Sequence, residues 1–231
     1  MKISILTLFP EMFQGPFEYS IIKRAREKGL IEIIYVNIRE FGIGKHKTVD
    51  DTPYGGGIGM VMRVDVIHSA IMASKCQTGE DTNCREKTIL LSASGKTFKQ
   101  SIAKKYSKLD HLILVCGHYE GIDARIKHFI DEEISIGDFV VTGGEIPAML
   151  ITDAVTRLIP NVLKEGATEN ESFSLGRIEN PRLEYPHFTR PQLYENHAVP
   201  EILLSGNHHE IEKWRVMKSY EKTEDIKKIT E

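Results

Sequence analysis

The sequence lacks any apolar run that approaches the roughly 20 residues needed for a helix to cross a membrane. Its N-terminus also lacks the charged and apolar regions of a signal peptide. We therefore expect a cytoplasmic protein that does not contact a membrane. The formal net charge of −3 argues against an obligate nucleic-acid coat, which is normally strongly basic, but it leaves room for a local basic surface.

Cysteine is scarce, with only Cys76, Cys84 and Cys116 in 231 residues. These three form no Cys-x-x-Cys pair and cannot all pair with each other, so the sequence indicates neither a disulfide framework nor a zinc knuckle. We expect buried or incidental thiols and predict no metal site from the residues.

Short aliphatic and β-branched runs alternate with amphipathic helical patterns over the first two thirds of the chain. Strands are expected over residues 2–9, 31–38, 88–92, 111–116 and 133–136. Helices are expected over residues 17–28, 64–74, 98–107 and 145–158. This alternation predicts an α/β fold with a mainly parallel sheet that is covered on both faces.

The apolar periodicity stops between Pro160 and Pro191, where Pro, Gly, Asn and Glu accumulate. After this stretch, residues 199–204 and 210–220 have the pattern of two helices, with Trp214 as an apolar anchor. The predicted organisation is therefore an α/β domain over residues 1–160, a linker or lid over 161–190 and a small helical domain over 191–231.

Glycine interrupts two otherwise apolar segments, Ile113–Asp123 and Ser135–Ala148. A strand loses stability at each glycine, so Gly137, Gly143 and Gly144 indicate that the backbone closely approaches something else. Two such strand ends predict one shared pocket.

A third glycine-rich segment, Pro53–Met60, precedes a predicted helix and follows an acidic pair. By composition it is either a flexible turn or a loop that binds an anion or substrate. The two other glycine segments favour the functional interpretation.

Gly95-Lys96-Thr97 looks like the end of a phosphate-binding P-loop. That motif requires a glycine five residues earlier, where this chain has Leu90, so we predict a strand-to-helix turn instead. The chain also has no G-x-G-x-x-G segment after its first strand, which removes support for a dinucleotide site.

Carboxylates gather near arginines around the predicted linker. The residues concerned are Arg157, Glu165, Glu169, Glu171, Glu184, His187 and Arg190. Such a cluster is either solvated linker charge or a general base carried on a closing loop.

Eight segments together carry a family resemblance. They are Leu8–Phe13, Lys47–Asp51, Pro53–Met60, Cys116–Asp123, Ser135–Ala148, Asp153–Val155, Pro186–Pro191 and Leu204–His208. With these segments in order, the sequence resembles the bacterial tRNA (guanine-N1)-methyltransferases of the SPOUT class, the TrmD family, over nearly its full length.

The resemblance implies that the second half of the α/β domain is threaded as a deep trefoil knot, which is a rare exception among folds. It also implies that the knot holds S-adenosylmethionine in a bent shape and that two copies form a homodimer, each completing the other's active site. The donor-binding residues implied are Leu91, Ser92, Gly117, Tyr119, Glu120, Gly121, Ile136, Gly137, Val141, Gly143, Gly144 and Pro147.

The substrate implied is the guanine immediately 3′ of the anticodon, in tRNAs that carry a second guanine before it. The family uses an aspartate as the base and an arginine that stabilises charge on guanine O6; these positions align with Glu171 and Arg157, while Glu169 is a less favoured base. Glutamate for aspartate is a departure from the family pattern, as are about five extra residues before Pro186.

The resemblance further implies that the C-terminal helices grip the phosphates of the anticodon stem and that the target guanine leaves its stack. It allows for Mg²⁺, although the residues show no cluster that would bind it. The tRNA-binding residues implied are Asp50, Gly55, Gly56, Gly57, Gly59, Glu184 and His187.

Three functions are alternatives to tRNA (guanine-N1) methylation. The nearest is a related knotted RNA methyltransferase that acts on another base or on a ribose 2′-OH. The second is a non-catalytic RNA-binding relative, and the weakest is a P-loop phosphotransferase.

Overall fold

The computed structural model describes residues 1–76, 83–177 and 180–230. The chain divides into two compact units, Met1–Leu163 and Lys164–Glu231, each of which is described by itself. Within the described residues, no helix combines the length and the apolar character that crossing a membrane requires.

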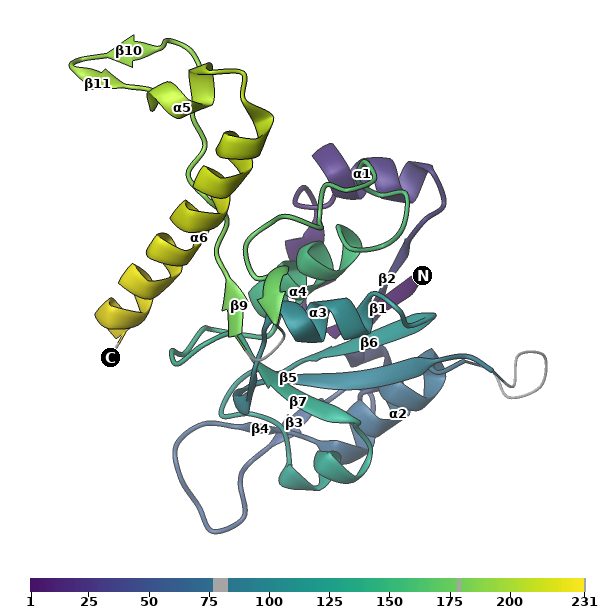
Figure 1. The fold of residues 1–231 in the computed structure, drawn as a ribbon. Helices are drawn as coiled ribbons and strands as arrows, with labels where there is room; N and C mark the ends of the chain where they lie inside the picture. The colour runs from purple at the N-terminus through teal and green to yellow at the C-terminus, as the bar shows by residue number, and fades with distance from the viewer. Residues whose placement is uncertain (77–82, 178–179, 231) are drawn as a thin grey trace. The chain divides into compact units, whose positions relative to one another are not determined.

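The first unit is built on a five-stranded sheet in the order β2-β1-β6-β5-β7 (Figure 1). All its neighbouring strands are parallel, which confirms the predicted sheet. The strands are β1 (Lys2–Thr7), β2 (Glu32–Asn37), β5 (Glu86–Thr97), β6 (His111–Cys116) and β7 (Glu132–Ser135).

Both faces of the sheet are covered by helices, as the sequence predicts (Figure 1). Because successive strand residues point to opposite faces, Leu112 and Leu114 of β6 pack in one core cluster, and Ile113 and Val115 pack in the other. On the first face lie α1 (Ser20–Glu27), α3 (Gln100–Tyr106) and α4 (Glu145–Thr156); on the second lies α2 (Val64–Ser74).

Shorter elements complete the first unit. A two-stranded antiparallel sheet joins β3 (Asp50–Asp51) to β4 (Val61–Met62). Single 3-10 turns occupy Pro10–Phe13, Ile38–Phe41 and Ala124–His128.

The turn predicted at Gly95-Lys96-Thr97 is wrong, because these residues belong to β5. The strand register shifts between Leu91 and Lys96, after which Lys96 and Thr97 pair with β7. A Cβ on Gly95 would lie 2.5 Å from the backbone nitrogen of Ile134, so only glycine allows this close approach of the two strands.

The expectation that no cysteine is paired is also wrong. Cys76 and Cys84 form a disulfide, while Cys116 is free and buried. Cys76 follows α2 and Cys84 precedes β5, so the disulfide joins the end of this helix to the start of this strand. An odd number of cysteines rules out complete pairing, but it does not rule out one pair.

The second unit contains structure within the stretch predicted as a linker, namely an antiparallel pair of β8 (Leu175–Arg177) and β9 (Asn180–Arg182). Two residues of that stretch, 178 and 179, lie outside the described part. The rest of the unit comprises β10 (Leu193–Tyr194), β11 (His197–Ala198), α5 (Glu201–Leu204) and α6 (His208–Thr230).

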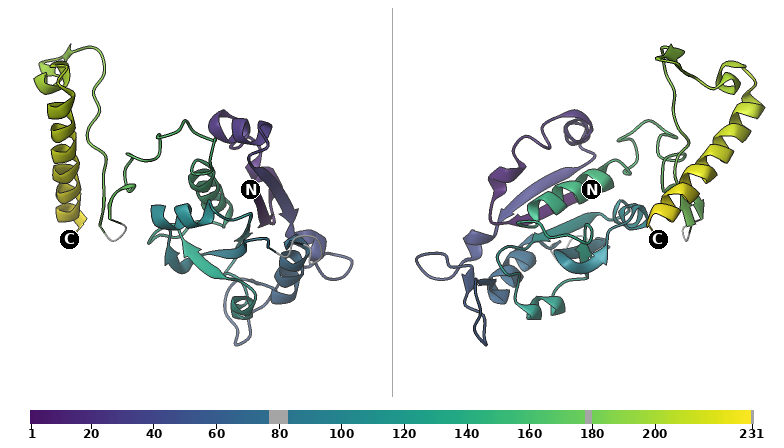
Figure 2. Two further views of the ribbon diagram at one scale, coloured as in Figure 1. Left: turned by 45° about the vertical axis from the view of Figure 1, so that its right-hand side comes forward. Right: turned by 90° about the vertical axis from the view of Figure 1, so that its left-hand side faces the viewer.

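The chain around β9 runs along α6 in the opposite direction (Figure 2). Asn180 accepts a hydrogen bond from Lys227, the amide of Leu183 donates to Thr223, and Phe188 packs near Trp214. Trp214 is thus an apolar contact of the unit. The helix is longer than the predicted 210–220.

The core of the first unit generates a stability prediction. Ile113 is fully buried at the centre of the sheet, so Ile113→Ala should lower the free energy of unfolding by about 2–5 kcal/mol through lost burial and a residual cavity. Met72 on α2 is 56% exposed, so Met72→Ala should change that free energy by no more than about 0.5 kcal/mol. Urea denaturation measures both, and equal losses would contradict this account of the core.

Candidate functional site

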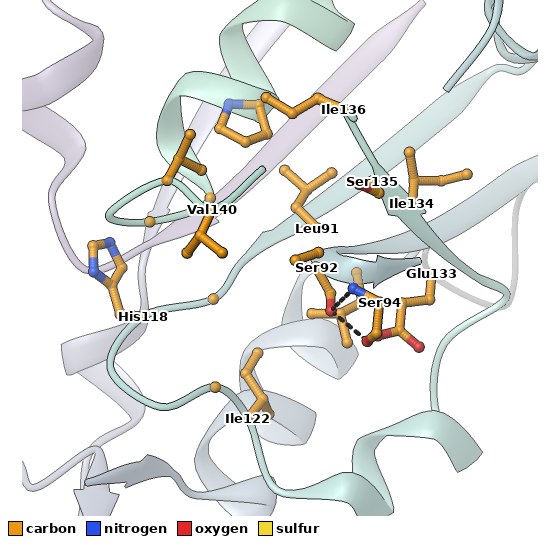
Figure 3. A pocket seen from close by; sticks show the side chains of 18 of the residues that line it. Leu91, Ser92, Ser94, His118, Ile122, Glu133, Ile134, Ser135, Ile136 and Val140 are labelled. Carbon is orange, nitrogen blue, oxygen red and sulfur yellow. Dashed lines mark hydrogen bonds between the residues drawn. The ribbon is translucent and has the colours of Figure 1, made fainter. Parts of the chain in front are cut away.

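A cavity of about 420 Å³ opens at the carboxyl ends of β5, β6 and β7 (Figure 3). This is the edge at which parallel α/β sheets commonly bind ligands. Three chain segments line it: the middle of β5, the loop after β6, and the segment from β7 to the start of α4. In Figure 3, Leu91 and Ser92 lie at the centre of the view, with Ile136 above them and His118 and Val140 to their left. The shared pocket predicted from the two glycine-bearing strand ends is therefore present.

The structure places almost all of the predicted donor residues on this cavity. Gly137 is the exception; it lies between the lining residues Ile136 and Phe139. The predicted residues that line the cavity are Leu91, Ser92, Gly117, Tyr119, Glu120, Gly121, Ile136, Val141, Gly143, Gly144 and Pro147.

Gly143 and Gly144 hold two lining segments together. The amide of Gly144 donates to the carbonyl of Gly117 at 3.0 Å. A Cβ on Gly144 would lie 2.5 Å from the Cα of Cys116, and a Cβ on Gly143 would collide with the ring of His118. The close backbone approach inferred from the sequence is therefore observed at both positions.

A buried carboxylate ties the same region to β1. Glu145, the first residue of α4, is 1% exposed and accepts a hydrogen bond from the Thr7 hydroxyl at 2.6 Å. Its other oxygen lies 2.7 Å from Nε2 of His118, whose ring packs edge-on against Phe9. Since a buried carboxylate is costly unless its oxygens are hydrogen-bonded, these contacts fix the start of α4 against the loop after β6.

Two titratable groups have shifted pKa values, namely Glu133 in the wall of the cavity and the buried Cys116 next to the lining residue Gly117. Burial raises the pKa of the Cys116 thiol, and the charge of Glu145 raises it further. Burial would also raise the pKa of Glu133, but hydrogen bonds from Ser94 and Ser92 and the ion pair with Lys127 hold it below its usual value. The cavity therefore presents an ionised carboxylate at neutral pH.

Several lining residues were missed by the sequence reasoning, including Ser94, His118 and Glu133. His118 stands between glycines already singled out, so its position was a usable signal. Glu133 begins a predicted strand, and only the pairing of β7 with β5 brings it to Ser94, whose hydroxyl donates to it at 2.7 Å.

The predicted substrate loop contacts the loop that follows β6. The amide of Glu120 donates to the carbonyl of Met60, and a Cβ on Gly59 would lie 2.6 Å from the carboxylate of Glu120. Asp50, at the start of this hairpin, pairs with Met62. The tip beside Gly55, Gly56 and Gly57 carries the fully exposed side chains of Tyr54 and Ile58.

The predicted catalytic pair is divided between the two units. Arg157 follows the last residue of α4 in the first unit, whereas Glu171 belongs to the second unit, where its carbonyl accepts from the amide of Ser174. Glu184 also lies in the second unit; its carboxylate pairs with Nε2 of His187 at 2.8 Å, and its amide donates to the hydroxyl of Ser172.

Comparisons with known proteins agree on one family. A family model described as "tRNA (Guanine-1)-methyltransferase TrmD" matches residues 1–228. A tRNA (guanine-N(1)-)-methyltransferase of Dictyoglomus turgidum is 52% identical over 96% of this chain and 86% of its own length. Relatives of the same name are 53% identical in Carboxydothermus hydrogenoformans, over 95% of this chain and 83% of theirs, and 48% identical in Staphylococcus epidermidis, over 98% and 90%.

The close approach at Gly144 predicts that adding a side chain there lowers the stability of the protein. Gly144→Ala should lower the free energy of unfolding by about 1–3 kcal/mol, because the new Cβ meets backbone atoms of β6 that have no room to move. Gly117→Ala is the matched control, since a Cβ there would meet only ordinary contacts at 3.5 Å and beyond. Thermal and urea unfolding compare the two variants, and an equally stable Gly144→Ala protein would contradict the packing described.

Proposed function

The chain belongs to the TrmD family of tRNA (guanine-1)-methyltransferases, and from this premise we infer that it transfers a methyl group from S-adenosylmethionine to N1 of a guanine in tRNA. The observation that carries the inference is the match of the family model from residue 1 to residue 228, which includes every segment that lines the cavity. The acceptor proposed is the guanine immediately 3′ of the anticodon, and the cytoplasm is the proposed location.

The cavity suits S-adenosylmethionine as the methyl donor. Its volume of about 420 Å³ lies within the roughly 300–1,000 Å³ range of small-molecule sites. Leu91, Ile136 and Pro147 offer apolar surface for a flat base, and the ionised carboxylate of Glu133 offers a partner for a cationic group. The backbone at Gly143 and Gly144 can approach a ligand with no intervening side chain.

When bound, S-adenosylmethionine supplies an electrophilic methyl group. The protein must then orient the acceptor and remove the proton from guanine N1. We assign the removal of this proton to the carboxylate of Glu171. Arg157 is assigned as the hydrogen-bond donor that stabilises negative charge developing on guanine O6. Glu169 is the alternative base.

Contacts with the tRNA are proposed on both units. In the first unit, Asp50 and the loop from Gly55 to Gly59 would meet the substrate, supported by the attachment of this loop to Glu120 in the wall of the cavity. In the second unit, Glu184 and His187 would lie near the target guanine, and the C-terminal helices would contact phosphates of the anticodon stem.

A homodimer with each active site completed by the partner is also proposed, together with the knotted threading of the donor-binding half. An exposed apolar surface beside the cavity supports a subunit contact, because patches of this kind mark interaction sites. Its members include Phe139, Val140, Ile146 and Leu150, which are 46–87% exposed.

The proposed reaction predicts that labelled methyl passes from S-adenosylmethionine to a tRNA transcript with guanine immediately 3′ of the anticodon, and not to one with adenine there. The product should be 1-methylguanosine on nucleoside analysis. A label recovered on another base or on a ribose would assign the chain to a related methyltransferase. Failure of the donor to raise the melting temperature would point instead to a non-catalytic RNA-binding protein.

The assignment of the base predicts that Glu171→Gln lowers turnover by roughly 10²–10⁴-fold, the usual contribution of general base catalysis. Donor binding, measured by calorimetry, should stay intact because the variant keeps the size of the side chain. Glu169→Gln is the matched control and should retain activity. Full activity in Glu171→Gln would reject the assignment, and loss in Glu169→Gln alone would transfer the role to Glu169.

A further inference from the structure

A second cluster of reactive side chains lies at the edge of the sheet opposite the donor cavity. Cys76 follows the end of α2, Cys84 precedes β5, Glu86 begins β5, and His111 begins β6. Glu86 and His111 are direct partners in the strand register. Because β5 and β6 are parallel, their amino ends bring these residues together far from the carboxyl ends that form the cavity.

The potential ligand atoms in this cluster lie close to one another. One ligand atom from each of Cys76, Cys84 and Glu86 lies within 4.8 Å of the other two. Nδ1 of His111 is 2.7 Å from Oε2 of Glu86 and 3.7 Å from Sγ of Cys76. Two sulfurs and a carboxylate oxygen therefore converge on one small region, and the imidazole of His111 lies beside Glu86 and Cys76 at its border.

The residues around these atoms hold them in place. His111 is 1% exposed, and its Nε2 lies 2.9 Å from the hydroxyl of Ser4, so the ring is held with Nδ1 directed at the cluster. The amide of Cys76 donates to Oε2 of Glu86 at 2.8 Å. Ligating histidines in metal sites usually have their second nitrogen fixed in this way, because that contact sets the tautomer and the ring orientation.

We propose that Cys76, Cys84, Glu86 and His111 form a structural Zn²⁺ site when the two cysteines are reduced. Thiolate and imidazole ligands select zinc among the common divalent ions, and four protein ligands make a closed structural site. The site would attach the connection between α2 and β5 to the sheet. It is independent of the methyl-transfer reaction.

The disulfide and the zinc complex are alternative states of the same cysteine pair. A dithiol reductant supplies two electrons and two protons, the S–S bond breaks, and the reductant becomes a cyclic disulfide. The two thiols formed then release two protons as Zn²⁺ binds their sulfurs. A reducing cytoplasm, which keeps most thiols reduced, favours the zinc state.

The proposal is tested on the full chain after reduction with a phosphine and removal of metals. One equivalent of Zn²⁺ should be retained through gel filtration, raise the melting temperature and protect two thiols from a thiol reagent. Cys116 does not enter the count, because it is buried and its thiol pKa is raised. Co²⁺ in place of Zn²⁺ should give the absorption of tetrahedral thiolate coordination.

Glu86→Gln separates metal binding from disulfide formation, because it removes a ligand and leaves both cysteines. It should weaken Zn²⁺ binding at least by the roughly 10-fold that even outer contacts of a metal site contribute. Glu40→Gln is the matched control, since Glu40 is exposed and follows β2 at the carboxyl end of the sheet. Cys76→Ser should abolish retention.

Three outcomes would overturn the proposal. The first is a reduced protein that retains no Zn²⁺ and leaves both thiols reactive in its presence. The second is a disulfide that resists the phosphine in the folded protein. The third is an equal loss of Zn²⁺ affinity in Glu86→Gln and Glu40→Gln, which would indicate general attraction to negative charge.

Discussion

The architecture of the first unit depends on the contact between the start of α4 and the end of β6. Gly144 lies against Cys116 and Gly117 with no room for a Cβ. The next residue, Glu145, places both oxygens of a buried carboxylate on groups from two other segments, Thr7 and His118. Because an unpaired carboxylate in this position would cost several kcal/mol, the three segments hold one arrangement. The cavity lies directly beside this contact and takes its shape from it.

Strong local patterns in the sequence predicted most of the fold of the first unit. The predicted bounds of α2 and β6 agree with the structure, because α2 has a clear apolar face and β6 is a buried aliphatic run with no polar interruption. The glycines at 143 and 144 also indicated their close approach correctly, since a Cβ on Gly143 would meet the His118 ring and a Cβ on Gly144 would meet the backbone of Cys116. In these cases, the residues that are adjacent in the sequence are sufficient to determine the local structure.

Other features depend on contacts that no local pattern contains. The last part of β5 pairs with β7 after a register shift, and only that pairing makes Gly95 a strand residue and brings Ser94 to Glu133. Helix α6 extends beyond its predicted end because ion pairs three residues apart, such as those of Lys218 with Glu221 and Lys227 with Glu224, support a polar helix that has little apolar periodicity. The pairing of Cys76 with Cys84 likewise depends on the return of the chain from α2 to β5.

The two ends of β5 and β6 differ in how accessible they are to a ligand. The carboxyl ends border an open cavity, whereas the amino ends carry side chains that contact one another. Near the carboxyl edge, the middle of β5 carries Ser92, Ala93 and Ser94, and the loop after β6 carries Gly117 and Gly121. These small residues leave backbone groups open to a ligand of about the size of the cavity. At the amino edge, β5 begins with Glu86 and β6 begins with His111. Their side chains contact each other, and His111 also contacts the hydroxyl of Ser4. A ligand exchanged in every reaction cycle needs the open edge, because it must enter and leave. The proposed structural Zn²⁺ site needs the closed edge, since a structural metal ion stabilises the fold only while it stays bound.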